Sequence, residues 1–205
     1  MRLGVLVSGG GTNLQALLDA GFEVGLVLSD RPAVRALERA EAAGVPTACL
    51  RVGDYPDRAA YSAAVAAALA AHGCELVVLA GYLKILRGPI FEVYGGRIIN
   101  THPALLPLFG GPGMHGLAVH QAVLDHGCKV SGCTVHFVDE SVDGGPIIAQ
   151  TAVEVADDDT AESLQARILP HEHAALVGVV AALAEGRVTV EGRRVRIAPP
   201  TEVTT

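Results

Sequence analysis

Residues 3–15 read LGVLVSGGGTNLQ: an apolar run of strand length, three glycines and the start of a helical pattern. Apolar runs of the same kind recur at 23–28, 47–51, 75–79 and 97–100, and helical segments begin near Thr12, Ala33, Asp57 and Leu83. Strands that are almost wholly apolar and separated by helices are typical of a parallel sheet covered on both faces. The sequence therefore predicts an α/β fold built on a doubly wound, mostly parallel sheet.

The second half of the chain follows a different pattern. A proline- and glycine-rich segment over 102–113 leads to a helix predicted at 117–126, and two extended runs at 131–139 and 146–155 flank the turn DGG. Those runs predict a hairpin joined to the sheet. A helix over 160–185, which Pro170 is expected to bend, and a short antiparallel hairpin around Glu191 and Gly192 follow. Residues 1–198 are predicted to form one domain and residues 199–205 a frayed tail.

Composition limits the class of protein. The 205 residues include 15 Lys and Arg against 22 Asp and Glu, half of all residues are apolar, and the net charge is -7. This excludes a disordered chain, a collagen-like repeat and a strongly basic nucleic-acid module. The four cysteines show no C-x-x-C pairing and are interpreted as reduced core thiols. No export signal or bilayer span is apparent, so we expect a cytoplasmic protein without a nucleic-acid or membrane partner.

The glycine run after the first strand is the first candidate site. Glycines there let the backbone approach a ligand, and free N–H groups at a helix N-terminus bind anions. No Gly-Lys-Ser/Thr follows, so the loop is not a P-loop, and Leu14 stands where a dinucleotide fingerprint needs its third glycine. Asp30, at the end of the second strand, keeps a nicotinamide cofactor open as an alternative. We favour a small phosphate site with Thr12 and Asn13 as side-chain donors.

Two further groups of residues have side chains suited to catalysis. Asn100 and His102 are two positions apart at the end of the fifth strand, so both side chains point to one face, at the edge where ligands bind in doubly wound sheets. An amide donor and an imidazole suit an oxyanion site and general acid-base chemistry. Asp143 lies in a turn with Asp139 and Glu140 close by; a plain turn residue is the competing interpretation.

A metal site is not predicted. His171 and His173 are two residues apart on a predicted helix, so their rings point to nearly opposite faces. His115 and His120 are also poorly spaced, and no cysteine or acidic residue completes a ligand set.

Three blocks of sequence, in this order, resemble one family. SGGGTNLQ (8–15), IINTHPALLP (98–107) and GCTVHFVDESVDGGPIIAQ (132–150) are similar to the motifs of the phosphoribosylglycinamide formyltransferases, folate-dependent enzymes of purine synthesis. The resemblance runs from Arg2 to about Ala184. It implies a Rossmann-like formyltransferase fold. It also implies transfer of a formyl group from the co-substrate 10-formyltetrahydrofolate to the amine of glycinamide ribonucleotide, without a metal.

The resemblance also implies roles for individual residues. Asn100 and His102 stabilise the oxyanion of an acyl transfer, and Asp143 orients His102 and helps to move a proton. The ribonucleotide is held by Gly11, Thr12, Asn13, Arg58 and Glu172, with Arg58 near the phosphate. The folate pocket is shaped by Lys84, Ile85, Leu86, Val138, Asp139 and Glu140.

Two departures and two alternatives remain. The segment LFGGPGMHGLAVH (108–120) is longer than in many relatives, and AALVG follows HEH (171–173) where a Tyr-Pro pair is common. A formyltetrahydrofolate hydrolase and a non-catalytic nucleotide-binding module are the alternative functions. The sequence leaves the oligomeric state open, with a homodimer as one alternative.

Overall fold

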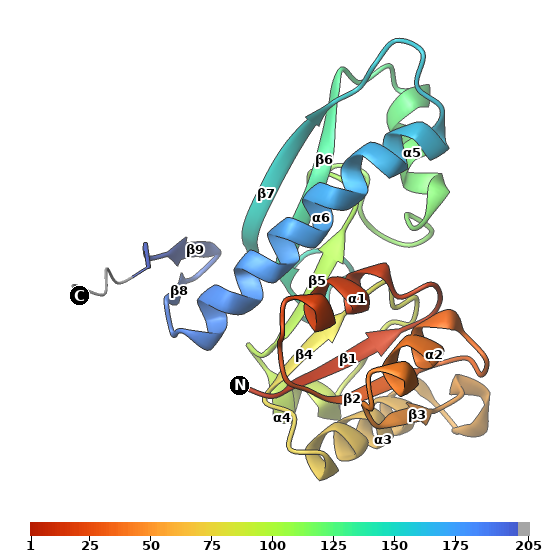
Figure 1. Ribbon diagram of the computed structural model, residues 1–205, viewed down its shortest axis with the longest axis vertical. Helices are drawn as coiled ribbons and strands as arrows, with labels where there is room; N and C mark the ends of the chain where they lie inside the picture. The colour runs from red at the N-terminus through yellow and green to blue at the C-terminus, as the bar shows by residue number, and fades with distance from the viewer. Residues whose placement is uncertain (201–205) are drawn as a thin grey trace.

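The computed structural model describes residues 1–200, which form a seven-stranded sheet and a separate two-stranded hairpin (Figure 1). The strands of the sheet are β1 (Leu3–Val7), β2 (Val24–Ser29), β3 (Thr47–Cys49), β4 (Leu76–Leu79), β5 (Ile98–His102), β6 (Val130–Phe137) and β7 (Ile147–Glu154). Their order is β3-β2-β1-β4-β5-β6-β7. The first five are parallel, whereas β6 and β7 join antiparallel. The predicted α/β fold with a doubly wound, mostly parallel sheet is confirmed.

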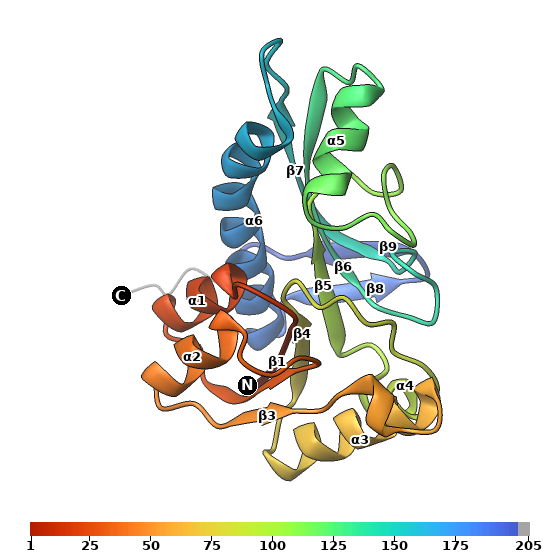
Figure 2. The same cartoon turned by 90° about the vertical axis from the view of Figure 1, so that its right-hand side faces the viewer.

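Helices cover both faces of the sheet (Figure 2). They are α1 (Thr12–Asp19), α2 (Arg35–Ala42), α3 (Arg58–Ala71), α4 (Pro89–Tyr94), α5 (Leu117–Asp125) and α6 (Ala161–Ala184), with a 3-10 turn at Val52–Asp54. Alternate residues of β1 point to opposite faces. Val5 packs with α1, α2 and α6, whereas Leu6 packs with α3 and α4. Each face of the sheet thus has its own apolar core. The carboxyl ends of the parallel strands lie at the edge of the sheet, where a site can form.

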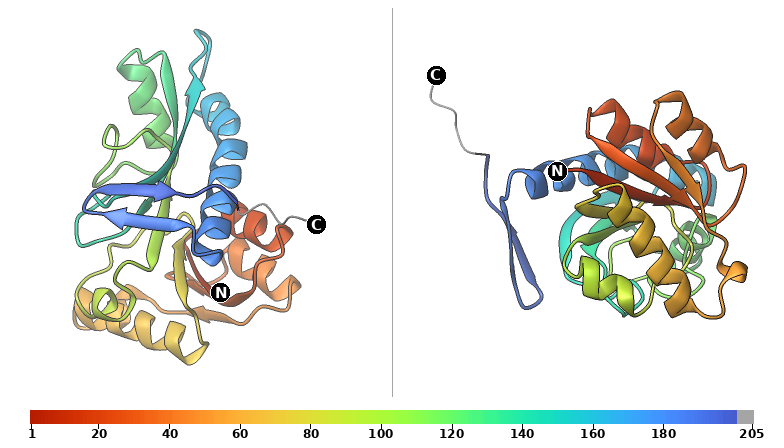
Figure 3. Two further views of the ribbon diagram at one scale, coloured as in Figure 1. Left: turned by 90° about the vertical axis from the view of Figure 1, so that its left-hand side faces the viewer. Right: turned by 90° about the horizontal axis from the view of Figure 1, so that it is seen from below.

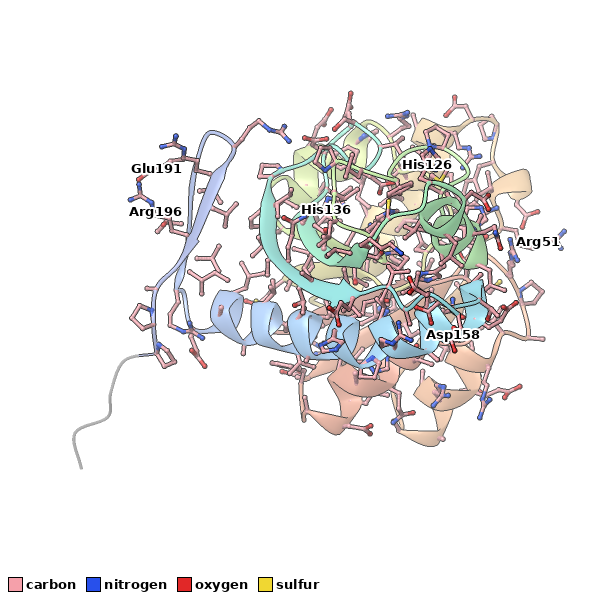
Figure 4. The ribbon with its side chains drawn as sticks, turned by 90° about the horizontal axis from the view of Figure 1, so that it is seen from above. Arg51, His126, His136, Asp158, Glu191 and Arg196 are labelled. Carbon is pink, nitrogen blue, oxygen red and sulfur yellow. The ribbon has the colours of Figure 1, made fainter. Side chains whose placement is uncertain are left out.

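The C-terminal hairpin forms a second, two-stranded sheet. Its strands are β8 (Val188–Glu191) and β9 (Arg194–Ile197), joined by a turn at Gly192 and Arg193, as the sequence predicts. Val188 and Val195 pack against the main core, and Figure 3 shows the hairpin running beside the sheet with its turn near the β6–β7 connection. Figure 4 shows Glu191 and Arg196 on the outer side of the hairpin, pointing away from the sheet.

One predicted helix begins later than expected. The pattern indicated a helix from Leu83, but residues 80–88 form an irregular segment and α4 starts at Pro89. Side-chain hydroxyls take the backbone N–H groups of this segment: Ser8 Oγ accepts from Leu83 at 2.9 Å, and Ser62 Oγ accepts from Arg87 at 2.9 Å. Proline at the first helical position then starts the helix.

The cysteine prediction is partly wrong. Cys74 and Cys133 are buried, but Cys49 is exposed on β3 because this short strand forms one edge of the sheet and ends there. Helix α6 continues through Pro170. Residues 199–200 have no regular secondary structure, and the rest of the predicted tail lies outside the described residues. Within residues 1–200, no helix is long and apolar enough to cross a bilayer.

Candidate active site

A cavity of about 430 Å³ lies at the carboxyl ends of β4 and β5, between the 80–88 segment, α6 and the β6–β7 connection. This is the edge of a doubly wound sheet where ligands bind. The cavity brings together nine of the predicted site residues: Asn100, His102, Asp143, Glu172, Lys84, Ile85, Leu86, Val138 and Asp139. The three predicted catalytic side chains therefore share one cavity with most of the predicted folate wall.

Asn100 lies directly opposite His136 in the antiparallel pair formed by β5 and β6. Its Nδ2 atom is 3.1 Å from His136 Nε2. His136 Nδ1 is 2.8 Å from the Phe137 carbonyl oxygen, which can only accept, so Nδ1 carries the proton and Nε2 accepts from Asn100. A shift of register between Val135 and His136 lies at the same point. The pair fixes the Asn100 amide, which keeps its second N–H for a ligand.

His102 is held by a backbone group. Its Nε2 atom donates to the Phe109 carbonyl oxygen at 2.8 Å, and its Nδ1 atom lies 3.8 Å from Asp143 Oδ2. β5 extends to His102, two residues beyond the predicted end, because it continues its pairing with β6. The hydrogen bond that orients His102 thus comes from Phe109, while Asp143 provides a nearby negative charge.

Asp143 occupies a left-handed backbone conformation, with φ of 52°. Asp tolerates this conformation better than most residues. Its Oδ2 atom accepts from the Gly111 N–H at 2.9 Å, and its Oδ1 atom is 3.9 Å from His136 Nε2. Two residues further on, a Cβ atom on Gly145 would lie 1.9 Å from the Phe137 carbonyl oxygen, so only glycine fits there. Asp143 therefore lies between two histidines on a closely packed turn.

Glu172 of α6 connects the cavity to the glycine loop. Its Oε1 atom accepts from Asn13 Nδ2 at 2.7 Å and from Thr101 Oγ1 at 3.0 Å, and the residue is only 8% exposed. Asn13 is in the first turn of α1, while Thr101 lies between Asn100 and His102 on β5. The carboxylate thus connects the start of α1 to β5.

The glycine loop turns tightly into α1. Gly11 caps α1 with φ of 72°, and a Cβ atom there would lie 2.6 Å from the Ala36 Cβ atom. Thr12 is the exposed first residue of the helix. Gly11, Thr12 and Asn13 are not among the cavity-lining residues within 1–200, and Asn13 reaches the cavity through Glu172. Their phosphate role stays a prediction.

The predicted folate residues separate into two groups. Lys84, Ile85, Leu86, Val138 and Asp139 line the cavity, and Val138 packs against the apolar cluster that contains Leu86. Lys84 Nζ is 3.3 Å from Asp30 Oδ2, whose side chain is fully buried, so this ion pair holds the lysine at the wall. In the described part of the chain, the lining does not include Glu140 or Arg58. Glu140 lies in the turn after Asp139, Arg58 is the exposed first residue of α3, and their predicted roles remain predictions.

Burial changes the acid-base behaviour of two other cavity histidines. Burial lowers the pKa of His136, and the nearby His102 lowers it further, although Asp143 opposes the shift. Burial also lowers the pKa of His120, again with His102 nearby. Both rings are therefore neutral at pH 7. No cluster of three or more His, Cys, Asp or Glu side chains within residues 1–200 is arranged to hold a metal ion.

Several groups at the site were not predicted: His136, Thr101, and the backbone of Phe109 and Gly111. The last two lie in the 108–120 segment, and they contact His102 and Asp143 respectively. The alternation of residues 133–138 puts His136 on the same face of its strand as Thr134 and Val138. Its contact with Asn100, however, depends on the register of β5 and β6.

The fold and the cavity define a formyl transferase. The chain belongs to the formyl transferase family, whose sequence model matches residues 1–180. It is 48% identical to the phosphoribosylglycinamide formyltransferase of Mycobacterium tuberculosis over 197 residues, which covers 94% of this chain and 89% of that protein. The crystal structure of glycinamide ribonucleotide transformylase 1 from Symbiobacterium toebii superposes with a TM-score of 0.92 at 47% identity, covering 97% and 94% of the two chains.

A longer relative contains the same unit. The chain is 41% identical to the trifunctional purine biosynthetic protein adenosine-3 of Bos taurus, an alignment that covers 98% of this chain but only 20% of that protein.

Proposed function

We propose that this protein transfers the formyl group of 10-formyltetrahydrofolate to the amine of glycinamide ribonucleotide, yielding formylglycinamide ribonucleotide and tetrahydrofolate. The observation that carries the proposal is the convergence of Asn100, His102 and Asp143 in one cavity, with Glu172 linking that cavity to the glycine loop. These are the donor, acid-base and carboxylate groups that an acyl transfer between two nitrogen atoms requires.

Attack of the ribonucleotide amine on the formyl carbon produces a negative charge on the formyl oxygen. The free N–H of the Asn100 amide stabilises this charge, because His136 fixes the amide by accepting its other N–H. A proton on His102 Nδ1 makes that ring a cation beside the Asp143 carboxylate, which adds to the stabilisation.

Asp143 then transfers a proton between the two reacting nitrogen atoms. The attacking nitrogen must lose one proton, and the folate nitrogen must gain one as its bond to the formyl carbon breaks. A carboxylate 3.8 Å from His102 Nδ1 and 3.9 Å from His136 Nε2 can accept the proton and pass it on, directly or through a water molecule.

The two substrates occupy different parts of the site. The phosphate of the ribonucleotide binds at Gly11, Thr12 and Asn13, where the helix N-terminus favours an anion, and Glu172 holds the polar part of the same substrate. The folate ring lies against Lys84, Ile85, Leu86, Val138 and Asp139, which line the same cavity. We place the reaction in the cytoplasm and assign no metal to it.

An assay for tetrahydrofolate formation, run with and without glycinamide ribonucleotide, tests the proposal. Folate product that depends on the ribonucleotide supports the transferase. Equal product without the ribonucleotide would identify a hydrolase instead, and no product under either condition would favour a non-catalytic nucleotide-binding protein.

A further inference from the structure

Arginine side chains hold the loop that carries Asp143 from two sides. We define the catalytic loop as residues 139–145. Arg87 Nη1 donates to the carbonyl oxygen of Glu140, and Arg193 Nη2 donates to the carbonyl oxygen of Gly144 at 2.8 Å. One hydrogen bond therefore precedes Asp143 in the sequence and the other follows it.

Both arginines are themselves attached to the scaffold. The backbone N–H of Arg87 donates to the Oγ atom of Ser62, a fully buried residue of α3. Arg193 is in the turn of the β8–β9 hairpin, whose Val188 and Val195 pack on the main core (Figure 3). The two donors thus come from opposite halves of the chain, and each is fixed by contacts independent of the other.

The catalytic loop has few internal contacts of its own. Asp139 Oδ1 accepts from the Ser141 N–H at 2.8 Å and from the Ser141 hydroxyl, and these bonds close only the first turn. Asp143 adds the bond from Gly111, which comes from another loop. Residues 139–141 are exposed, and exposed hydrogen bonds open more readily than buried ones, so bonds to the scaffold help to fix where Asp143 lies relative to His102 and His136.

We propose that Arg87 and Arg193 are positioning residues that hold the catalytic loop, and hence Asp143, at its distance from the two histidines. The C-terminal hairpin, which lies beyond the residues 1–180 that the family model matches, then supports the reaction without touching a substrate. The inference rests on the proposed function for its kinetic consequences, whereas the loop contacts themselves can be tested without activity.

The experiment compares Arg87→Ala and Arg193→Ala with the control Arg194→Ala. Arg194 is the next residue of the same hairpin and pairs with Glu191, which points away from the sheet in Figure 4. The control removes the same charge from the outer side of the hairpin. Amide hydrogen exchange of residues 139–145 is followed by mass spectrometry, together with kcat and the KM for each substrate.

We expect exchange in the catalytic loop to become about two- to tenfold faster in Arg87→Ala and Arg193→Ala, the change that corresponds to losing one net hydrogen bond. A fall in kcat of about the same size should accompany it, with the KM for the ribonucleotide unchanged. Arg193→Lys should restore part of kcat, because lysine can still donate to the carbonyl oxygen of Gly144. Arg194→Ala should behave as the wild type.

Unchanged exchange in either alanine variant would overturn the proposal, and so would equal effects in Arg194→Ala. Faster exchange with a wild-type kcat would also overturn it, since the position of the loop would then have no bearing on the reaction. If the wild-type protein showed no formyl transfer, the proposed function would fail, but the exchange data would still decide whether the two arginines hold the loop.

Discussion

His102 Nδ1 and Asp143 Oδ2 lie 3.8 Å apart, too far for a direct hydrogen bond and within the distance of an ion pair. The remaining bonds of the two residues come from one segment, since the Phe109 carbonyl oxygen accepts from His102 and the Gly111 N–H donates to Asp143. The backbone of Phe109 and Gly111 therefore fixes the positions of His102 and Asp143. The Asp143 carboxylate stays free to interact with a protonated imidazole or a substrate amine.

Asp143→Asn should reduce kcat severely, by about 10²- to 10⁴-fold, because a neutral amide neither favours protonated His102 nor accepts a proton. Asn tolerates the left-handed conformation as well as Asp does, and its Oδ1 atom can still accept from Gly111, so the melting temperature should change little. The pH dependence of kcat should also shift. A folded variant with a wild-type rate and profile would show that Asp143 only forms the turn.

His102→Ala should lower kcat by roughly 10²- to 10⁴-fold, the usual contribution of a positioned acid-base group. Since His102 is 4% exposed and the loss of its ring leaves the Phe109 carbonyl without this donor, some loss of stability is also expected. Turnover should therefore be measured well below the melting temperature of the variant. Activity close to wild type in the folded variant would end the catalytic assignment.

Asn100→Ala should cost on the order of 10²- to 10³-fold in kcat, the loss typical of one oxyanion donor. The ribonucleotide contacts predicted at the glycine loop are unaffected, so calorimetry should give nearly the same affinity for that substrate. A large loss of affinity with an unchanged kcat would show that Asn100 binds the substrate and does not stabilise the oxyanion.

Gly11→Ala should weaken ribonucleotide binding and destabilise the fold by about 1–3 kcal/mol, because alanine is strained at φ of 72° and its Cβ atom meets Ala36. Gly10→Ala is the matched control, since beyond its two chain neighbours no residue has an atom within 4 Å of a Cβ atom placed there. Calorimetric titration and thermal melting of both variants test this. Equal behaviour of the two variants would contradict the proposed geometry of the loop.

The sequence could predict that Asn100 and His102 face one cavity, because they are two residues apart in extended backbone at a strand end. His136 could not be found in this way, since it meets Asn100 only through the antiparallel register of β5 and β6. The contacts of Phe109 and Gly111 are made by a backbone carbonyl and a backbone N–H, which do not distinguish one residue type from another except at proline. The helix wrongly predicted from Leu83 fails for a related reason, because the hydroxyls of Ser8 and Ser62, distant in sequence, take amides that a helix would use.

The stability of the protein should fall as the pH decreases from 7 to 5. Burial lowers the folded-state pKa of His120, His136 and His173 below the ordinary value of 6.5, so in this range the unfolded chain binds protons that the folded chain does not. This loss of stability is absent above about pH 7 and grows as the pH falls through 6.5.

His120 is the residue with which to test this pH dependence. Neither of its ring nitrogens has a hydrogen-bond partner within residues 1–200, so replacing it leaves no other group without a partner. His120→Phe, of similar shape, should flatten the dependence of melting temperature on pH and should equal or exceed the wild type in stability at pH 5. His126→Phe, at an exposed position at the end of α5, serves as the control and should leave the slope unchanged. A wild-type slope in His120→Phe would show that burial of this ring does not contribute to the pH dependence.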